Sequence, residues 1–137
     1  MAKVLLIIED DPLIVKIYST RLKADGFEVF SAENGEDGIA LIEEKKPDVI
    51  VLDVMMPRVD GFGVLEAIAR QGDAKKIPVL VYSNLASEEE IARAKAMGAT
   101  EFIVKADISP TEMVAKIKGY LGSGGSAVPA QSSAPTP

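Results

Sequence analysis

The sequence of 137 residues has a formal net charge of −6, is 47% hydrophobic and 26% charged, and contains neither cysteine nor histidine. This composition is typical of one globular domain and excludes disulfides, thiol chemistry, Ser-His-Asp triads and any phosphohistidine of its own. The acidic balance argues against direct nucleic-acid binding, and no apolar run approaches the ~18 residues of a membrane span, so we expect a cytoplasmic protein without membrane insertion.

The first part of the chain shows two strand patterns, each followed by a helix pattern. The apolar run Lys3–Ile8 predicts a buried strand that leads directly into an acidic stretch. Asp11 is the expected N-cap of the next helix, because Pro12 suits a first helical turn. Phe27–Ala32 predicts a second strand, and Asn34 predicts the cap of a second helix. The expected apolar stripe of the first helix consists of Leu13, Ile14, Ile17, Tyr18 and Leu22.

A third apolar run, Asp48–Asp53, carries a carboxylate at each end. A run rich in β-branched residues fits a strand buried on both faces, and Pro57 prevents its continuation. A charge where a buried strand enters a loop is costly unless another group pairs with it. We therefore interpret Asp53 as a functional residue, a phosphoryl acceptor. A third helix is expected from about Phe62 to Arg70.

The last part of the chain adds two strands and two helices. Ile77–Tyr82 predicts a fourth strand, and Ser87 with Glu90 predicts a capping box at the start of a fourth helix. Glu101–Val104 predicts the fifth strand, and Ser109 starts a last helix. The apolar stripe of that helix consists of Met113, Val114, Ile117, Tyr120 and Leu121.

Strand and helix thus alternate five times, which predicts an α/β fold with a parallel sheet and helices on both faces. We expect a doubly wound, five-stranded sheet in the order 2-1-3-4-5. Residues 1–121 form the predicted domain. Residues 122–137 (GSGGSAVPAQSSAPTP) have little to bury, and are interpreted as a disordered Gly/Ser/Pro/Ala tail or a truncated linker.

Polar side chains follow four of the five predicted strands. Glu9 and Asp10, then Asp53, Ser83 and Lys105, all stand at carboxyl ends, where parallel sheets bind ligands. The first and third strands are neighbours in this order, which puts Asp10 beside Asp53. Clustered carboxylates repel one another unless a divalent cation lies among them, and oxygen ligands suit Mg²⁺ or Mn²⁺. Lys105 and Ser83 offer a cation and a hydroxyl donor to phosphoryl oxygens.

Taken together, these motifs resemble the receiver domain of bacterial two-component response regulators, with its flavodoxin-like, chemotaxis-regulator fold. The resemblance spans about Ala2–Leu121. It is carried by Glu9–Asp10, Asp53, Met56, Pro57, Asp60–Gly61, Ser83, Phe102 and Lys105. It implies that a histidine kinase or histidine phosphotransfer protein phosphorylates the domain. It also implies a downstream effector protein or domain that binds a face formed by the fourth helix, fifth strand and fifth helix.

The resemblance implies a role for each acid. Asp53 would attack the phosphorus of a kinase phosphohistidine and carry the acyl phosphate. Asp10 and Asp53 would bind Mg²⁺ directly, together with the backbone carbonyl of Met55, whereas Glu9 would act through a water molecule. Catalysis would be limited to self-phosphorylation and slow dephosphorylation.

The remaining implied roles belong to the last two strand ends. Lys105 would pair with the phosphoryl group, Ser83 would hydrogen-bond it and move inward, and Phe102 would swing into the vacated space. Two positions depart from the family pattern. Ala106 stands where a proline usually follows the lysine, and Asn84 stands where a small residue usually follows the hydroxyl residue.

Three alternatives compete with this interpretation. A degenerate receiver would never take phosphate and would act as a binding module. A haloacid-dehalogenase-type phosphatase needs a second aspartate where this sequence has Met55. A flavodoxin-like electron carrier would have a loop rich in Ser, Thr and Gly after the first strand, where this loop is acidic.

Overall fold

The computed structural model describes residues 2–54, 60–71, 77–84 and 87–122. Predictions on Met55, Met56 and Pro57, and on the tail from 123 onward, lie outside these residues. The helices and strands are β1 (Val4–Ile8), α1 (Pro12–Ala24), β2 (Glu28–Ala32), α2 (Gly35–Lys45), β3 (Val49–Leu52), α3 (Gly61–Arg70), β4 (Val79–Ser83), α4 (Glu88–Ala96), β5 (Glu101–Val104), the 3₁₀ helix η2 (Lys105–Asp107) and α5 (Pro110–Leu121).

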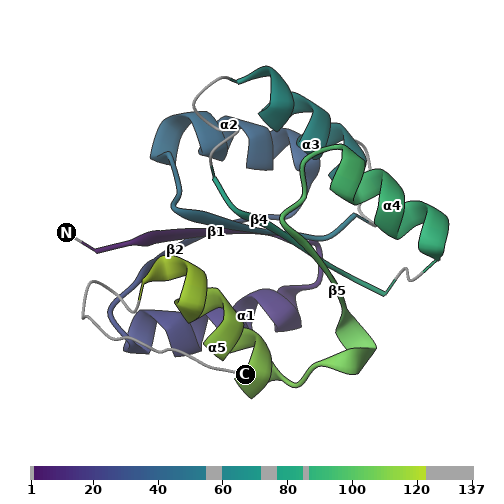
Figure 1. The fold of residues 1–137 in the computed structure, drawn as a ribbon. Helices are drawn as coiled ribbons and strands as arrows, with labels where there is room; N and C mark the ends of the chain where they lie inside the picture. The colour runs from purple at the N-terminus through teal and green to yellow at the C-terminus, as the bar shows by residue number, and fades with distance from the viewer. Residues whose placement is uncertain (1, 55–59, 72–76, 85–86, 123–137) are drawn as a thin grey trace.

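The sheet has five strands, all parallel, in the order β2-β1-β3-β4-β5, which confirms the predicted topology. Helices α2, α3 and α4 cover one face, and α1 and α5 cover the other (Figure 1). Within the described part of the chain, no helix is long and apolar enough to cross a membrane.

The central strands carry the core. All four residues of β3 are buried, which accounts for the uninterrupted apolar run there. Ile50 and Leu52 pack in a cluster with α2, α3 and α4, whereas Val49 and Val51 pack in a second cluster with α1 and α5. This division follows from strand geometry, because successive side chains point to opposite faces. Each fully buried aliphatic side chain stabilises the fold by about 1.5–3 kcal/mol.

Side chains satisfy the free amides at the helix starts as the sequence predicts. Asp11 accepts a hydrogen bond from the Leu13 amide at 3.0 Å, and Asn34 accepts one from the Asp37 amide at 2.9 Å. The last helix begins with a complete capping box, in which Ser109 and the glutamate three residues later bind each other's amides. Each cap contributes about 0.5–2 kcal/mol of stability.

The structure corrects two predictions about the helices. Leu13 was expected on the buried stripe of α1, yet it is 63% exposed. The buried positions Tyr18 and Leu22 are four residues apart, and Leu13 is rotated away from that line because the helix turns about 100° per residue. At α4, Ser87 accepts from the Glu90 amide as predicted, but the Glu90 carboxylate binds the Ser87 hydroxyl, at 2.7 Å, where a capping box has the Ser87 amide.

The predicted strand ends are accurate at their functional, carboxyl-terminal side. The fourth strand begins at Val79, two residues after the predicted Ile77, and β3 begins at Val49. These amino-terminal ends lie far from the acidic loops. The carboxyl ends, which set the position of the polar side chains, fall within one residue of the predicted ends: β3 ends at Leu52, one residue before Asp53, and β4 ends at Ser83, one residue after Tyr82.

Candidate functional site

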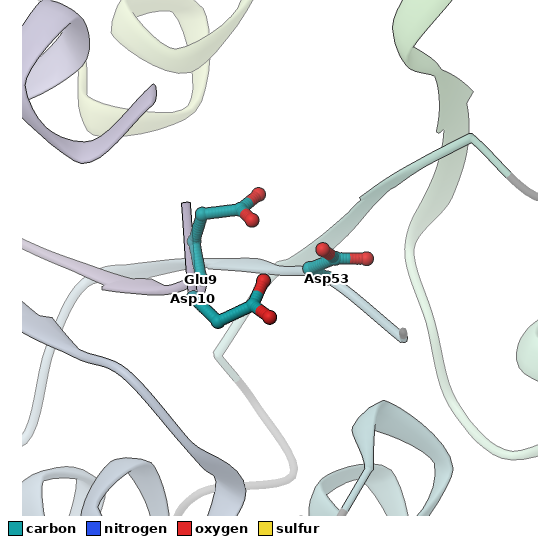
Figure 2. A group of neighbouring side chains, drawn as sticks. All are labelled: Glu9, Asp10 and Asp53. Carbon is teal, nitrogen blue, oxygen red and sulfur yellow. The ribbon is translucent and has the colours of Figure 1, made fainter. Parts of the chain in front are cut away.

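Three acidic side chains meet at the ends of the two central strands β1 and β3. Glu9 and Asp10 follow β1 directly, and Asp53 follows β3. The register pairs Ile8 with Leu52, and the Asp53 amide donates to the Ile8 carbonyl at 2.9 Å, so the two strand ends are level. One oxygen from each of the three carboxylates lies within 4.8 Å of the others. Figure 2 shows the carboxyl groups of Glu9 and Asp10 directed toward Asp53.

Burial differs sharply among these acids. Glu9 is 2% exposed and Asp53 is 4% exposed, whereas Asp10 is exposed to solvent. A buried carboxylate needs a partner, and Lys105 supplies it from the end of β5. Its Nζ lies 2.8 Å from Glu9 Oε1 and 3.3 Å from Asp53 Oδ2. Lys105 therefore bridges Glu9 and Asp53, and the three side chains form one charged cluster.

Burial raises the pKa of Glu9 to about 7. The hydrogen bond from Lys105 lowers this pKa and the charge of Asp53 raises it, but both effects are smaller than that of burial. Burial on its own lowers the pKa of Lys105, yet its bond to Glu9 and its attraction to the two carboxylates outweigh burial and raise it. Glu9 thus exchanges a proton near neutral pH, while Lys105 remains an ammonium.

The donor set fits a hard divalent cation. Glu9, Asp10 and Asp53 offer only oxygen ligands, which Mg²⁺ and Mn²⁺ prefer over the nitrogen and sulfur ligands of zinc. When ionised, the three carboxylates carry three negative charges against the single charge of Lys105. A divalent cation would balance the remaining charge. The Met55 carbonyl, predicted as a further ligand, lies outside the described residues.

Ser83 and Phe102 lie on the same face of the sheet. Ser83 is the last residue of β4 and is fully buried. Phe102 on β5 pairs with Val81, and both pack with the core cluster under α2, α3 and α4. Because side chains two residues apart share a face, Ser83 points to the side of Phe102. The two side chains thus share one face of the sheet, and their coupled movement stays a prediction.

The structure shows where Ala106 and Asn84, the two departures from the family pattern, lie. Lys105 and Ala106 begin the short 3₁₀ helix η2, and no cis peptide bond occurs among the described residues. Asn84, directly after β4, is exposed. The Lys105 ammonium contacts Glu9, Asp53 and the ring of Tyr82.

Tyr82 is not among the predicted site residues. Lys105 Nζ lies 5.4 Å from the centre of the Tyr82 ring. The sequence signal for this contact was the strand alternation itself, since Tyr82 must face away from Ser83. Only the folded structure shows that the Lys105 side chain lies on the same face of the sheet as the Tyr82 ring.

The chain also matches known proteins in sequence. The sequence model of the response regulator receiver domain matches residues 5–118, most of the chain. The chain belongs to the response regulator receiver domain family. It is therefore the kind of domain that acts in two-component systems.

Related receiver-containing proteins are transcriptional regulators by name. The chain is 33% identical over 117 residues to a probable transcriptional regulator, ycf27, of Porphyridium aerugineum, covering 85% of this chain and 47% of the relative. It is 35% identical over 117 residues to the DNA-binding dual master transcriptional regulator RpaA of Synechocystis, covering 85% and 48%. The chain thus spans about half the length of these curated relatives.

Among solved structures, the receiver domain superposes on the chemotaxis protein CheY4 of Vibrio cholerae with a TM-score of 0.80 and 30% identity. The match covers 88% of this chain and all of the other. A receiver domain of a Francisella response regulator gives a TM-score of 0.77 at 27% identity, covering 87% and 96%. These similarities agree with the fold.

The raised pKa of Glu9 predicts how stability depends on pH in the metal-free receiver domain. Between the ordinary value of 4.5 and about 7, the folded protein keeps a proton on Glu9 that the unfolded chain has lost. The Glu9 contribution to stability is therefore fully present below pH 4.5 and is lost as the pH rises to about 7. We expect this loss to be about 1–3 kcal/mol in the free energy of unfolding.

Urea denaturation of the wild type and of Glu9→Gln across this window measures the effect. The pKa values of Glu101 and Glu112 are lowered, so these two groups affect stability below this pH window, and they do so equally in both proteins. Because glutamine resembles a protonated glutamate, the two proteins should be similarly stable below pH 4.5, and the wild type should become the less stable of the two as the pH rises to about 7. A difference that is constant with pH would show that Glu9 has no raised pKa.

Proposed function

We propose that this receiver domain accepts a phosphoryl group on Asp53 in a reaction that depends on Mg²⁺. The donor would be a phosphohistidine on a histidine kinase or a histidine phosphotransfer protein. The observation that supports this most directly is the meeting of three carboxylates and one ammonium at neighbouring strand ends. Mn²⁺ would serve in the same place.

The chemistry assigns each group a task. A carboxylate oxygen of Asp53 attacks the phosphorus, a new P–O bond forms, and the P–N bond to the donor imidazole breaks. Asp10, Asp53 and the Met55 carbonyl would hold the cation, and Glu9 would contact it through water. Bound there, the cation would neutralise charge on the transferring group. The ammonium of Lys105, already 3.3 Å from Asp53, would pair with the phosphoryl oxygens.

Phosphorylation would alter the face formed by α4, β5 and α5, which we call the output face. A phosphoryl group adds up to ~2 negative charges and three acceptor oxygens, which the Ser83 hydroxyl can bind. Phe102 would follow the inward movement of Ser83. Glu101 on β5 accepts hydrogen bonds from Lys116 at 2.9 Å and from Tyr120, both on α5, so β5 and α5 are linked at this face. A change at Phe102 would reach both elements.

The partner of the output face would be an effector protein or domain. The named regulators to which the chain is similar are about twice its length, which is consistent with an effector attached through residues 122–137 as a linker. The domain itself would not bind nucleic acid, because its net charge is −6.

The proposal is tested by incubating the purified protein with acetyl phosphate, a small phosphoryl donor. We expect intact-protein mass spectrometry to detect one added phosphoryl group with Mg²⁺ present, and none after the metal is removed with a chelator. Lack of labelling under both conditions would support the degenerate receiver instead. Equal labelling under both would contradict the metal site.

A further inference from the structure

The Lys105 ammonium has a third neighbour besides the two carboxylates. Its Nζ stands over the Tyr82 ring, 5.4 Å from the ring centre, while it binds Glu9 at 2.8 Å and Asp53 at 3.3 Å. The lysine side chain is only 13% exposed, so the ring and the ammonium meet away from bulk water. A cation over an aromatic face is attracted to it, and more strongly where water is excluded.

The fold determines which side of the sheet this ring occupies. Tyr82 lies on β4 next to Ser83 but points to the opposite face, into the core cluster under α1 and α5. Its register partner Ile103 belongs to the same cluster, and Lys105 follows two residues later, on the same side. Figure 2 shows Glu9 and Asp10 leaving their strand in opposite directions, both with carboxyl groups near Asp53.

Helix α1 holds the Tyr82 ring from its far end. The hydroxyl groups of Tyr18 and Tyr82 lie 2.8 Å apart, and the two rings meet edge to face with centres 5.7 Å apart and planes at 88°. Both residues are buried, at 2% and 6% exposure. A buried ring that packs against a second ring and is hydrogen-bonded through its hydroxyl has little freedom to turn. The face of the Tyr82 ring therefore stays beside the Lys105 side chain and restricts the positions that this side chain can take.

We propose that Tyr82 is a positioning residue for Lys105, and that its ring face holds the ammonium over Asp53 for phosphoryl binding. The inference rests on the proposed function, since it assigns Lys105 its phosphoryl partner. Lysine carries a flexible four-carbon stem, so fixing it in one arrangement when a phosphoryl group binds costs conformational entropy. The Tyr82 ring restricts the stem beforehand and so reduces this cost. The ring also attracts the ammonium without occupying any of its three N–H donors, which remain for oxygen acceptors.

Two substitutions separate positioning from packing. Tyr82→Phe keeps the ring face and removes only the hydroxyl, which leaves the buried Tyr18 hydroxyl without its partner. Tyr82→Leu keeps an apolar side chain and removes the ring. If Tyr82 acted only in packing and hydrogen bonding, both variants would lose stability and neither would change the lysine specifically.

The first measurement is the initial rate of Mg²⁺-dependent labelling by acetyl phosphate, below the unfolding transition of each variant. We expect Tyr82→Leu to react about five- to tenfold more slowly than the wild type, as loss of a desolvated cation–π contact implies. Tyr82→Phe should stay within about twofold of the wild type, although it is less stable. Equal rates for the wild type and the leucine variant, or equal slowing in both variants, would overturn the inference.

The second measurement does not need phosphorylation. NMR relaxation of the Lys105 Nζ, whose signal is identified by its loss in Lys105→Met, reports how firmly the ammonium is held. It should be ordered in the wild type and in Tyr82→Phe, and mobile in Tyr82→Leu. Ordered signals in all three proteins would refute the positioning role. If the wild type takes no phosphoryl group yet this NMR pattern appears, the proposed function fails while the Tyr82–Lys105 contact stands.

Discussion

Asp53→Asn is expected to abolish phosphoryl labelling, with a fall of at least about a hundredfold in rate. An asparagine amide has no carboxylate oxygen to attack phosphorus. The substitution also removes one of the three clustered carboxylates and leaves Lys105 with Glu9 as its carboxylate partner. The measurement is intact-protein mass spectrometry after acetyl phosphate and Mg²⁺, with circular dichroism to show that the variant is folded.

Asp48→Asn is the matched control, because it makes the same chemical change at the opposite end of the same strand. Asp48 accepts a hydrogen bond from the Val4 amide at 2.8 Å, far from the carboxyl ends of the sheet. This variant should be labelled at the wild-type rate. Labelling of Asp53→Asn at that rate would assign the acceptor to another residue, with Asp10 the first to examine.

Gly61→Ala is expected to destabilise the protein by about 3 kcal/mol, because α3 starts against the strand end that carries Asp53. A methyl group at Gly61 would lie 2.7 Å from the Asp53 carbonyl oxygen and closer still to the Val54 Cα. Both are backbone atoms, so no side chain can rotate to make room. The start of α3 would have to move away from the site, and the labelling rate should fall with the stability.

Gly119→Ala tests whether the effect comes from space or from glycine itself. Gly119 is within α5, and a methyl group there would meet no heavy atom within 4 Å. Alanine should raise stability by about 0.5–1 kcal/mol, since glycine is a poor helix former. Urea denaturation of Gly61→Ala and of Gly119→Ala measures the change in the free energy of unfolding of each. A Gly61→Ala protein as stable as the wild type would contradict the close approach of α3.

The sequence by itself determined the architecture and the place of the acids. Five short apolar runs alternate with helix patterns, and this alternation allows few arrangements other than a doubly wound parallel sheet. Asp53 is recognisable because a buried run ends in a charge, and Glu9 and Asp10 because the neighbouring run does the same. Caps such as Asp11 and Asn34 were equally readable. All of these signals are local or follow from the order of the strands.

The tertiary structure alone decided how the charged side chains divide their contacts. Glu9 and Lys105 are 96 residues apart, and no local pattern states that one is buried against the other. The same holds for Tyr18 and Tyr82, which belong to a helix and a strand 64 residues apart. Burial, pairing and pKa depend on the few ångströms across which side chains of different strands reach one another. Those distances are set by packing in three dimensions, which hydrophobic periodicity along the chain does not encode.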